Sequence, residues 1–215
     1  MSQSDSFIEE VTEEVRRDRL FAFGRKYGWI AVLAVFLVVG GAGFNEWRKA
    51  QATAKAQALG DAIYQALERD SSLSRLSALE GIPAEGAAEA LVALLAAGEA
   101  APVDAKRAGD LLETVIANAA LPQIYRDLAT LKLTMLADYP MMSDQRIARL
   151  EPLTAPGAPL RLVALEQKAL LHLERRENDM AQELLSEVIE DAGTSAAQRQ
   201  RAQQILIVLG GGGGA

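Results

Sequence analysis

The stretch from Tyr27 to Asn45, YGWIAVLAVFLVVGGAGFN, organises the rest of this chain, because it carries no charged residue. A helix needs roughly 20 predominantly apolar residues to cross about 30 Å of hydrocarbon, and this run is just long enough. A buried helix of a soluble protein is the alternative, but it is rarely this long and uncharged. The stretch predicts a membrane-spanning helix over 27–45, with these span residues: Trp29, Ile30, Val32, Leu33, Val35, Phe36, Leu37, Val38 and Val39.

The residues that flank this stretch predict its orientation. Aromatic rings at both ends, among them Trp29 and Trp47, suit the headgroup level of a bilayer. Lys and Arg close to a span stay on the cytoplasmic side. Five such residues precede the span, and three follow it at a comparable distance: Arg16, Arg17, Arg19, Arg25 and Lys26, then Arg48, Lys49 and Lys55. We therefore expect a single-pass protein of the bacterial inner membrane, with a cytoplasmic N-terminus and a periplasmic C-terminal domain.

A cleaved signal peptide is the competing interpretation of the same stretch. Its apolar core spans about 7–15 residues and precedes a small-residue cleavage site. Here the charged leader is long, and the first A-x-A pattern, Ala50 to Ala52, follows Glu46, Arg48 and Lys49. These features favour an uncleaved signal anchor.

The composition of the chain excludes several classes of functional site. The chain has 215 residues and no cysteine, which excludes disulfides, thiolate metal sites and cysteine nucleophiles. The chain has a net charge of −7, whereas nucleic-acid-binding proteins usually carry a basic surface patch, so we expect no nucleic-acid partner. Ala and Leu dominate, and alternating β-branched residues are nearly absent, so we expect helices throughout.

Residues 1–26 predict a cytoplasmic amphipathic leader helix. Ser6 and Glu9 form a capping-box pattern, and Ile8, Val11 and Val15 follow at helical spacing. Two interpretations stay open: a helix that docks to a partner, or a solvated lead-in to the span.

Helix-start signals beyond the span predict an all-α domain. Residues 46–70 favour a stalk that continues into the first helix of the domain. Ser71 and Ser72 precede a short apolar segment. Further helices are expected to start at or near Pro83, Pro102 and Asp104, Pro122, Ser143, Pro159, Asn178 and Thr194 or Ser195. The last of these helices should end at Leu209, which leaves residues 210–215 as a flexible Gly-rich tail.

An internal repeat is the strongest signal outside the span. Shifting the chain by 73 residues aligns AGDLLETVIANA, from Ala108, with AQELLSEVIEDA, from Ala181. The alignment continues without a gap to Leu136 and Leu209, and it contains ten identities in all. Two tetratricopeptide units of 34 residues span about 68 residues, so the spacing predicts tetratricopeptide-like repeats over 71–209, stacked as a solenoid. A degenerate helical bundle is the alternative. The residues expected to pack between helices are Ala108, Leu112, Val115, Ala129, Ala181, Leu185, Val188 and Ala202.

Catalytic signals are scarce. His172 is the only histidine, so with no cysteine it cannot belong to a usual zinc set, and we interpret it as a structural or surface residue. The glycines at 40, 41 and 43 and at 210–214 lack the Lys-Ser/Thr of a phosphate loop. We expect no enzyme, no cofactor, no metal and no catalytic residue.

A charged leader ending in GRKYGW, a span leaving as FNEWRKAQ, an Ala-rich stalk and degenerate repeats together resemble the YfgM-type family of ancillary subunits of the SecYEG translocon. This resemblance implies an inner-membrane protein whose periplasmic repeats bind emerging secreted polypeptides or pass them to periplasmic chaperones. We hypothesise that a groove formed by the helices between Ala108 and Leu209 binds the partner segment.

Two other non-enzymatic functions stay open. The chain could be an accessory subunit of a respiratory or photosynthetic membrane complex, or a scaffold for assembly of the cell envelope. Neither the span nor the repeats distinguish these functions from the translocon role, and the resemblance alone favours the latter.

Overall fold

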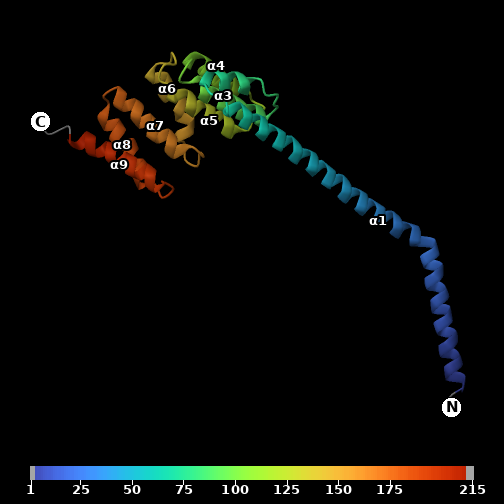
Figure 1. Cartoon of the computed structure of the whole chain (residues 1–215). Helices are drawn as coiled ribbons and strands as arrows, with labels where there is room; N and C mark the ends of the chain where they lie inside the picture. Colours follow the sequence, from blue (N-terminus) through green and yellow to red (C-terminus); the bar gives the residue numbers. More distant parts are fainter. Residues whose placement is uncertain (1–2, 212–215) are drawn as a thin grey trace. The chain divides into compact units, whose positions relative to one another are not determined.

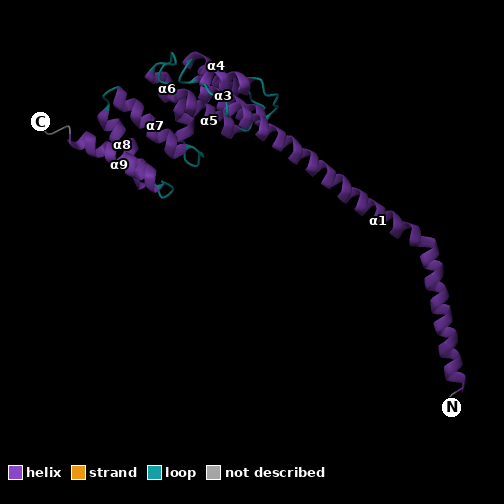
Figure 2. Cartoon of the chain, viewed as in Figure 1, coloured by secondary structure: helices purple, strands orange, loops and turns teal. Residues whose placement is uncertain are grey.

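The fold is all-α. The computed structural model describes the backbone of residues 3–211 and the side chains of residues 33–34 and 36–210. Every regular element in this part of the chain is a helix (Figure 2). The chain divides into two compact units, Met1–Ala58 and Leu59–Ala215, which are described separately below.

The elements follow one another along the chain in a simple order (Figure 1). They are α1 (Gln3–Leu67), α2 (Ser72–Glu80), α3 (Ala87–Ala100), α4 (Ala105–Ala117), α5 (Gln123–Met135), α6 (Ser143–Leu150), the 3₁₀ turn η1 (Glu151–Thr154), α7 (Arg161–Glu174), α8 (Asn178–Glu190) and α9 (Ala196–Gly211).

Helix starts follow local capping signals at several of the predicted positions. The Asp104 carboxylate accepts a hydrogen bond from the Arg107 backbone N–H at 2.9 Å, and α4 begins at the next residue. Ser71 and Ser195 make the equivalent bonds, at 3.2 Å, before α2 and α9. Each bond satisfies one of the four backbone donors that a helix N-terminus leaves without a partner.

Two expected helix boundaries are wrong. Pro83 does not lie in the first turn of α3, which begins at Ala87 after Gly86. Gly86 has φ 59° and ψ −127°, a conformation that is readily open only to glycine, so the chain turns there before the helix begins. The last helix does not end at Leu209, because α9 continues to Gly211; residues 212–215 lie outside the description.

The helices of the second unit pack against their neighbours in sequence. Contacts join α2 to α3, α3 to α4, α4 to α5, and so on to α8 and α9. The apolar core accordingly forms four clusters, each built from helices close together in the chain.

The helix positions repeat at the interval found in the sequence. The helices α4 and α8 each have 13 residues and begin 73 residues apart, at Ala105 and Asn178. The helices α5 and α9 also begin 73 residues apart, at Gln123 and Ala196.

The expected span lies only partly within the described residues. Trp29, Ile30, Val32 and Val35 fall outside the described side chains. Among the residues that are described, no helix has the length and apolar character needed to cross a bilayer. The described span residues on α1 are all exposed: Leu33, Phe36, Leu37, Val38 and Val39.

Candidate functional site

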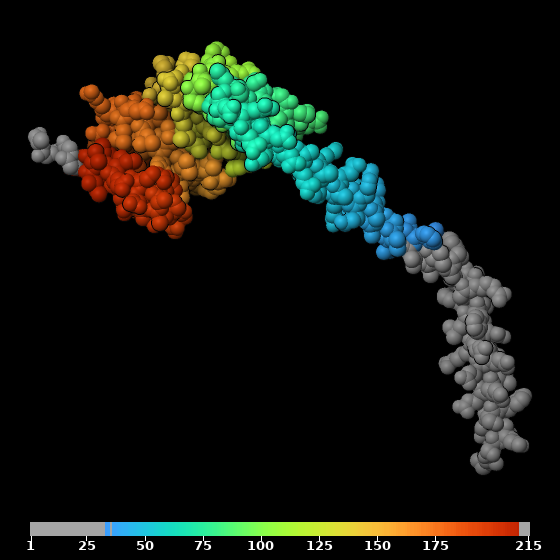
Figure 3. Space-filling view, viewed as in Figure 1, coloured from blue at the N-terminus to red at the C-terminus, as the bar shows by residue number. Residues whose placement is uncertain are grey.

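An exposed apolar groove lies between α7 and α9 of the second unit. Leu170 on α7 and Ile205 and Val208 on α9 give it an apolar lining, and its volume is about 530 Å³. Val208 is 74% exposed. Figure 3 shows α9, in red, at the surface beside the orange helices of the same unit. This groove can take apolar side chains from a partner.

One side of the groove is held by a buried carboxylate. Glu166 on α7 is 9% exposed, and both of its oxygens accept hydrogen bonds from Arg201 on α9, at 2.9 and 3.0 Å. Gln198 on α9 donates a third hydrogen bond to Glu166 and another to the Leu162 carbonyl, each at 3.0 Å. A bidentate pair of this kind fixes the relative position of two helices. These polar contacts therefore hold α7 and α9 together at one side of the groove, while the apolar lining residues stay exposed.

The helices α3 and α5 form a second groove at the equivalent place in the repeat. Its volume is about 310 Å³. Three of its lining residues, Ala97, Lys132 and Met135, lie 73 residues before Leu170, Ile205 and Val208 of the first groove. The two grooves therefore share three lining positions of the internal repeat, occupied by different side chains.

The residues predicted to pack between helices lie in the core, and none of them lines the groove between α7 and α9. Leu112 and Val115 are 1% and 3% exposed. The other six are fully buried: Ala108, Ala129, Ala181, Leu185, Val188 and Ala202. Of the eight, Leu112 also contributes to the wall of the α3–α5 groove.

The lining of the α7–α9 groove was not identified from the sequence. The 73-residue alignment includes these positions, but sequence alone does not separate an exposed apolar residue from a buried one. The available signal was an excess of apolar residues on α9: Ile205, Leu206, Ile207, Val208 and Leu209 are consecutive, whereas one buried face of a helix requires fewer.

His172 lies in the last turn of α7 and is buried, with 7% of its surface exposed. Its Nδ1 is 2.6 Å from Glu177 Oε2, across the turn that leads into α8. This hydrogen bond lowers the pKa of the Glu177 carboxyl, with a smaller contribution from Arg175. The pair braces a turn in which Arg176 has a positive φ of 62°. We interpret His172 as a structural residue.

Within the described residues, no group of three or more His, Cys, Asp or Glu side chains could hold a metal ion. The candidate site in this part of the chain is the exposed apolar groove between α7 and α9.

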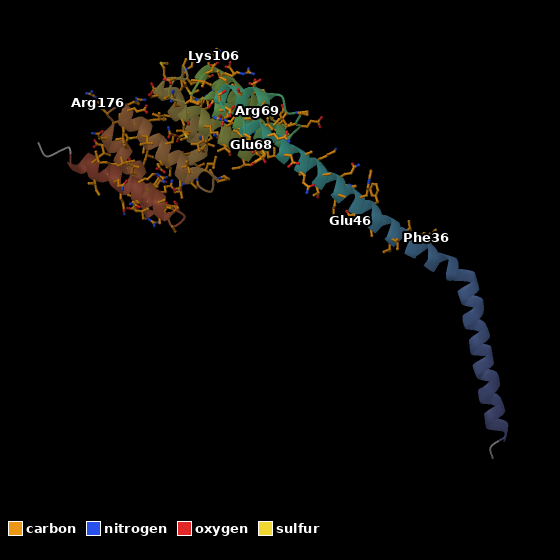
Figure 4. All side chains as sticks on the ribbon, viewed as in Figure 1. Phe36, Glu46, Glu68, Arg69, Lys106 and Arg176 are labelled. Carbon is orange, nitrogen blue, oxygen red and sulfur yellow. The ribbon has the colours of Figure 1, made fainter. Side chains whose placement is uncertain are left out.

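The first unit presents a different apolar surface, on α1. Phe36, Leu37, Val38 and Val39 are between 63% and 73% exposed. Farther along the helix, the rings of Phe44 and Trp47 lie 5.9 Å apart, centroid to centroid, and both are exposed. Figure 4 shows Phe36 and Glu46 projecting from α1.

No protein family, no curated protein and no solved structure matches this chain.

Proposed function

We propose that this chain is a membrane-anchored adaptor whose helical domain binds polypeptide segments, and that it works as an ancillary subunit of the SecYEG translocon. In this role α1 anchors the chain in the inner membrane with its N-terminus in the cytoplasm. The second unit lies in the periplasm, where it binds emerging secreted polypeptides or passes them to chaperones.

The strongest support for an anchor is the all-round exposure of apolar side chains on α1. Successive residues of a helix are rotated by about 100°, so Phe36, Leu37, Val38 and Val39 together point to every side. A groove on a partner protein covers only one side of a helix, whereas lipid surrounds it. Moving each such side chain out of water is favourable by about 1.5–3 kcal/mol.

The residues that follow the apolar segment fit the edge of a bilayer. Phe44 and Trp47 are aromatic residues, and aromatic rings are common at the headgroup level of a bilayer. The charged residues Glu46, Arg48 and Lys49 follow the apolar segment. This order supports a span that ends near Asn45.

The packing of the second unit supports tetratricopeptide-like repeats. Helices contact their sequence neighbours, both bounds of α4 recur 73 residues later in α8, and the start of α5 recurs in α9. Stacks of helix pairs have these two properties, and they present extended surfaces that suit binding of polypeptides. The groove between α7 and α9 offers such a surface.

The assignment to the translocon depends on the resemblance in the entry and exit of the span and in the repeats. A pull-down of the tagged full-length protein from mild detergent tests it, with mass spectrometry of the stoichiometric partners. We expect SecY, SecE and SecG together with periplasmic chaperones. Recovery of haem- or pigment-binding subunits instead would overturn the translocon role in favour of an accessory subunit.

The polypeptide-binding role is tested in the same experiment with Val208→Glu. This substitution places a charge in the apolar lining of the groove, so we expect loss of chaperones and secreted polypeptides with SecYEG retained through α1. Ala197→Glu is the matched control, since Ala197 is exposed on α9 and does not line the groove. Deletion of residues 71–209 should likewise abolish polypeptide binding; binding that survives this deletion rules out the proposal.

A further inference from the structure

We propose that the groove between α3 and α5 is a second binding site for the same polypeptide, and that it selects an apolar side chain next to a carboxylate. This inference rests on the proposed function, because it assumes that the α7–α9 groove binds polypeptide segments. It adds a second contact point and specifies the chemistry of the segment bound there.

The two grooves share three equivalent lining positions of the repeat. Ala97, Lys132 and Met135 occupy the positions that Leu170, Ile205 and Val208 occupy one repeat later. Met135 is 55% exposed and Val208 is 74% exposed, so each groove presents a large apolar side chain to an incoming segment. Leu136, which is half-buried, extends the apolar surface of the α3–α5 groove, and the buried Leu112 lies beneath it.

The two grooves differ in charge. Among the described residues that line the α3–α5 groove, the charged one is Lys132. In the α7–α9 groove, the charges of Glu166 and Arg201 are paired with each other. The α3–α5 groove therefore carries a positive charge beside its apolar surface, whereas the α7–α9 groove is close to neutral.

The surrounding domain makes this positive charge selective. From Leu59 to the end, the chain has 22 Asp and Glu against 14 Lys and Arg, a net charge of −8. A segment that carries a carboxylate is repelled by most of this surface and attracted at Lys132. By charge complementarity, the segment that binds in the α3–α5 groove has an apolar residue directly before or after an Asp or Glu.

Two linked sites change the affinity for one polypeptide. Once the first apolar residue is bound, the second contact becomes intramolecular, and overall affinity can rise by about 10²–10⁴-fold without any new kind of contact. We therefore expect a segment with two apolar anchors to bind much more tightly than a segment with one.

Synthetic peptides test the proposal on the full-length protein in lipid nanodiscs. One peptide carries a single Leu-Glu pair, and a series carries two such pairs joined by Gly-Ser linkers of increasing length. We expect the best two-pair peptide to bind about 100-fold more tightly than the single-pair peptide. Met135→Glu and Val208→Glu should each lower the affinity for the two-pair peptide to that for the single-pair peptide. Ile124→Glu is the matched control, since Ile124 is exposed on α5 and lines neither groove.

Charge exchange gives the second test. Lys132→Glu should weaken binding of the Leu-Glu pair, and a peptide in which one Leu-Glu pair is replaced by Leu-Lys should recover it. If Val208→Glu abolishes binding while Met135→Glu and Lys132→Glu leave it unchanged, the second site is refuted and the proposed function stands. If neither Met135→Glu nor Val208→Glu alters peptide binding, the polypeptide-binding function itself is refuted.

Discussion

A single glycine determines how closely α4 approaches the chain segment after α5. A Cβ at Gly109 would lie 2.0 Å from Cε2 of Tyr139, a distance that no pair of non-bonded carbons tolerates. Only a residue without a side chain therefore permits the Tyr139 ring to lie this close to α4, beside the core cluster of α3, α4 and α5. The cost is a glycine in the interior of a helix.

We expect Gly109→Ala to destabilise the protein. Overpacking costs about 1–3 kcal/mol, whereas replacing glycine by alanine in a helix returns at most about 1 kcal/mol. The clash should dominate, and a thermal unfolding scan measures the result. Gly60→Ala, in α1 with nothing within 4 Å of its Cβ, should raise stability. In a Tyr139→Ser background Gly109→Ala should become stabilising; a persistent loss there would contradict the steric explanation.

Asp191 connects the end of α8 to α7. Its carboxylate accepts a hydrogen bond from the Gly193 backbone N–H at 2.7 Å and pairs with Arg161 at 2.6 Å. The pKa of Asp191 lies below its usual value, mainly because of the hydrogen bond from Gly193 and to a smaller extent because of Arg161. The carboxylate is therefore stabilised in its charged form in the folded protein.

The pH dependence follows from this shift. A carboxyl whose pKa is lower in the folded state contributes stability above its unfolded pKa, about 3.9, and loses it as pH falls through the folded value. We expect Asp191→Asn to lower stability at pH 7, and the difference from the natural protein to shrink below about pH 4. Denaturant unfolding at several pH values measures this. Glu190→Gln, at an exposed position of α8, is the control; an equal pH-dependent difference there would discount the specific role of Asp191.

At the scale of elements, Arg146 holds the connection between α5 and α6 together. It is 9% exposed and donates hydrogen bonds to four backbone carbonyls, at 3.0–3.2 Å: those of Thr134, Ala137, Tyr139 and Met141. These carbonyls lie at the end of α5 and in the loop beyond it, where helix geometry leaves acceptors without partners. One side chain thus replaces the hydrogen bonds that the end of the helix lacks.

We expect Arg146→Met to cost about 3 kcal/mol, because it leaves several carbonyls without a donor in a largely buried setting. Arg149→Met on the same helix is the control. Arg149 pairs with Glu113 at 2.7 Å, but both side chains are more than one third exposed, so its loss should cost about 1 kcal/mol or less. Equal losses of unfolding free energy for the two variants would show that the hydrogen bonds to these carbonyls do not account for the stability that Arg146 contributes.

The same scale explains why the repeat leaves grooves. Small residues at repeat positions, such as Ala129 and Ala202, are fully buried and let neighbouring helices approach closely. The helices α7 and α9 are not neighbours in sequence, and the Glu166–Arg201 pair joins them along one edge. The apolar residues beside that pair stay uncovered and form the groove.

At the scale of the whole molecule, the two units present apolar surface in different forms. The first unit exposes consecutive apolar side chains around a helix, whereas the exposed apolar side chains of the second unit include those of two grooves on a domain of net charge −8. The exposed apolar side chains on α1 are the observation on which the proposed membrane anchor rests.

We expect the full-length chain to stay with membranes through an alkaline wash. Phe36→Asp combined with Val38→Asp should release it, since each Asp at the centre of a span costs about 2.5–3.5 kcal/mol. Ala52→Asp with Ala54→Asp, at exposed positions of α1 beyond the apolar segment, is the matched control and should change nothing. Recovery of the natural protein in the supernatant, or retention of the Phe36/Val38 variant in the pellet, would argue against the anchor.

The sequence by itself determined the all-α class, most of the helix starts and the 73-residue repeat. Caps such as Asp104 and Ser195 act on a backbone N–H three residues away, so the signal and its effect lie in one short stretch of chain. The helix start expected at Pro83 was wrong, because Gly86 takes a positive φ that no cap pattern announces.

Only the tertiary structure decided which apolar residues are covered. Leu185 and Val208 look alike in a sequence, yet one is fully buried and the other is 74% exposed. Burial depends on whether another helix lies over that face, and that helix is tens of residues away in the chain. The grooves, the Glu166–Arg201 brace and the four bonds of Arg146 all arise from such distant pairings, which local patterns do not encode.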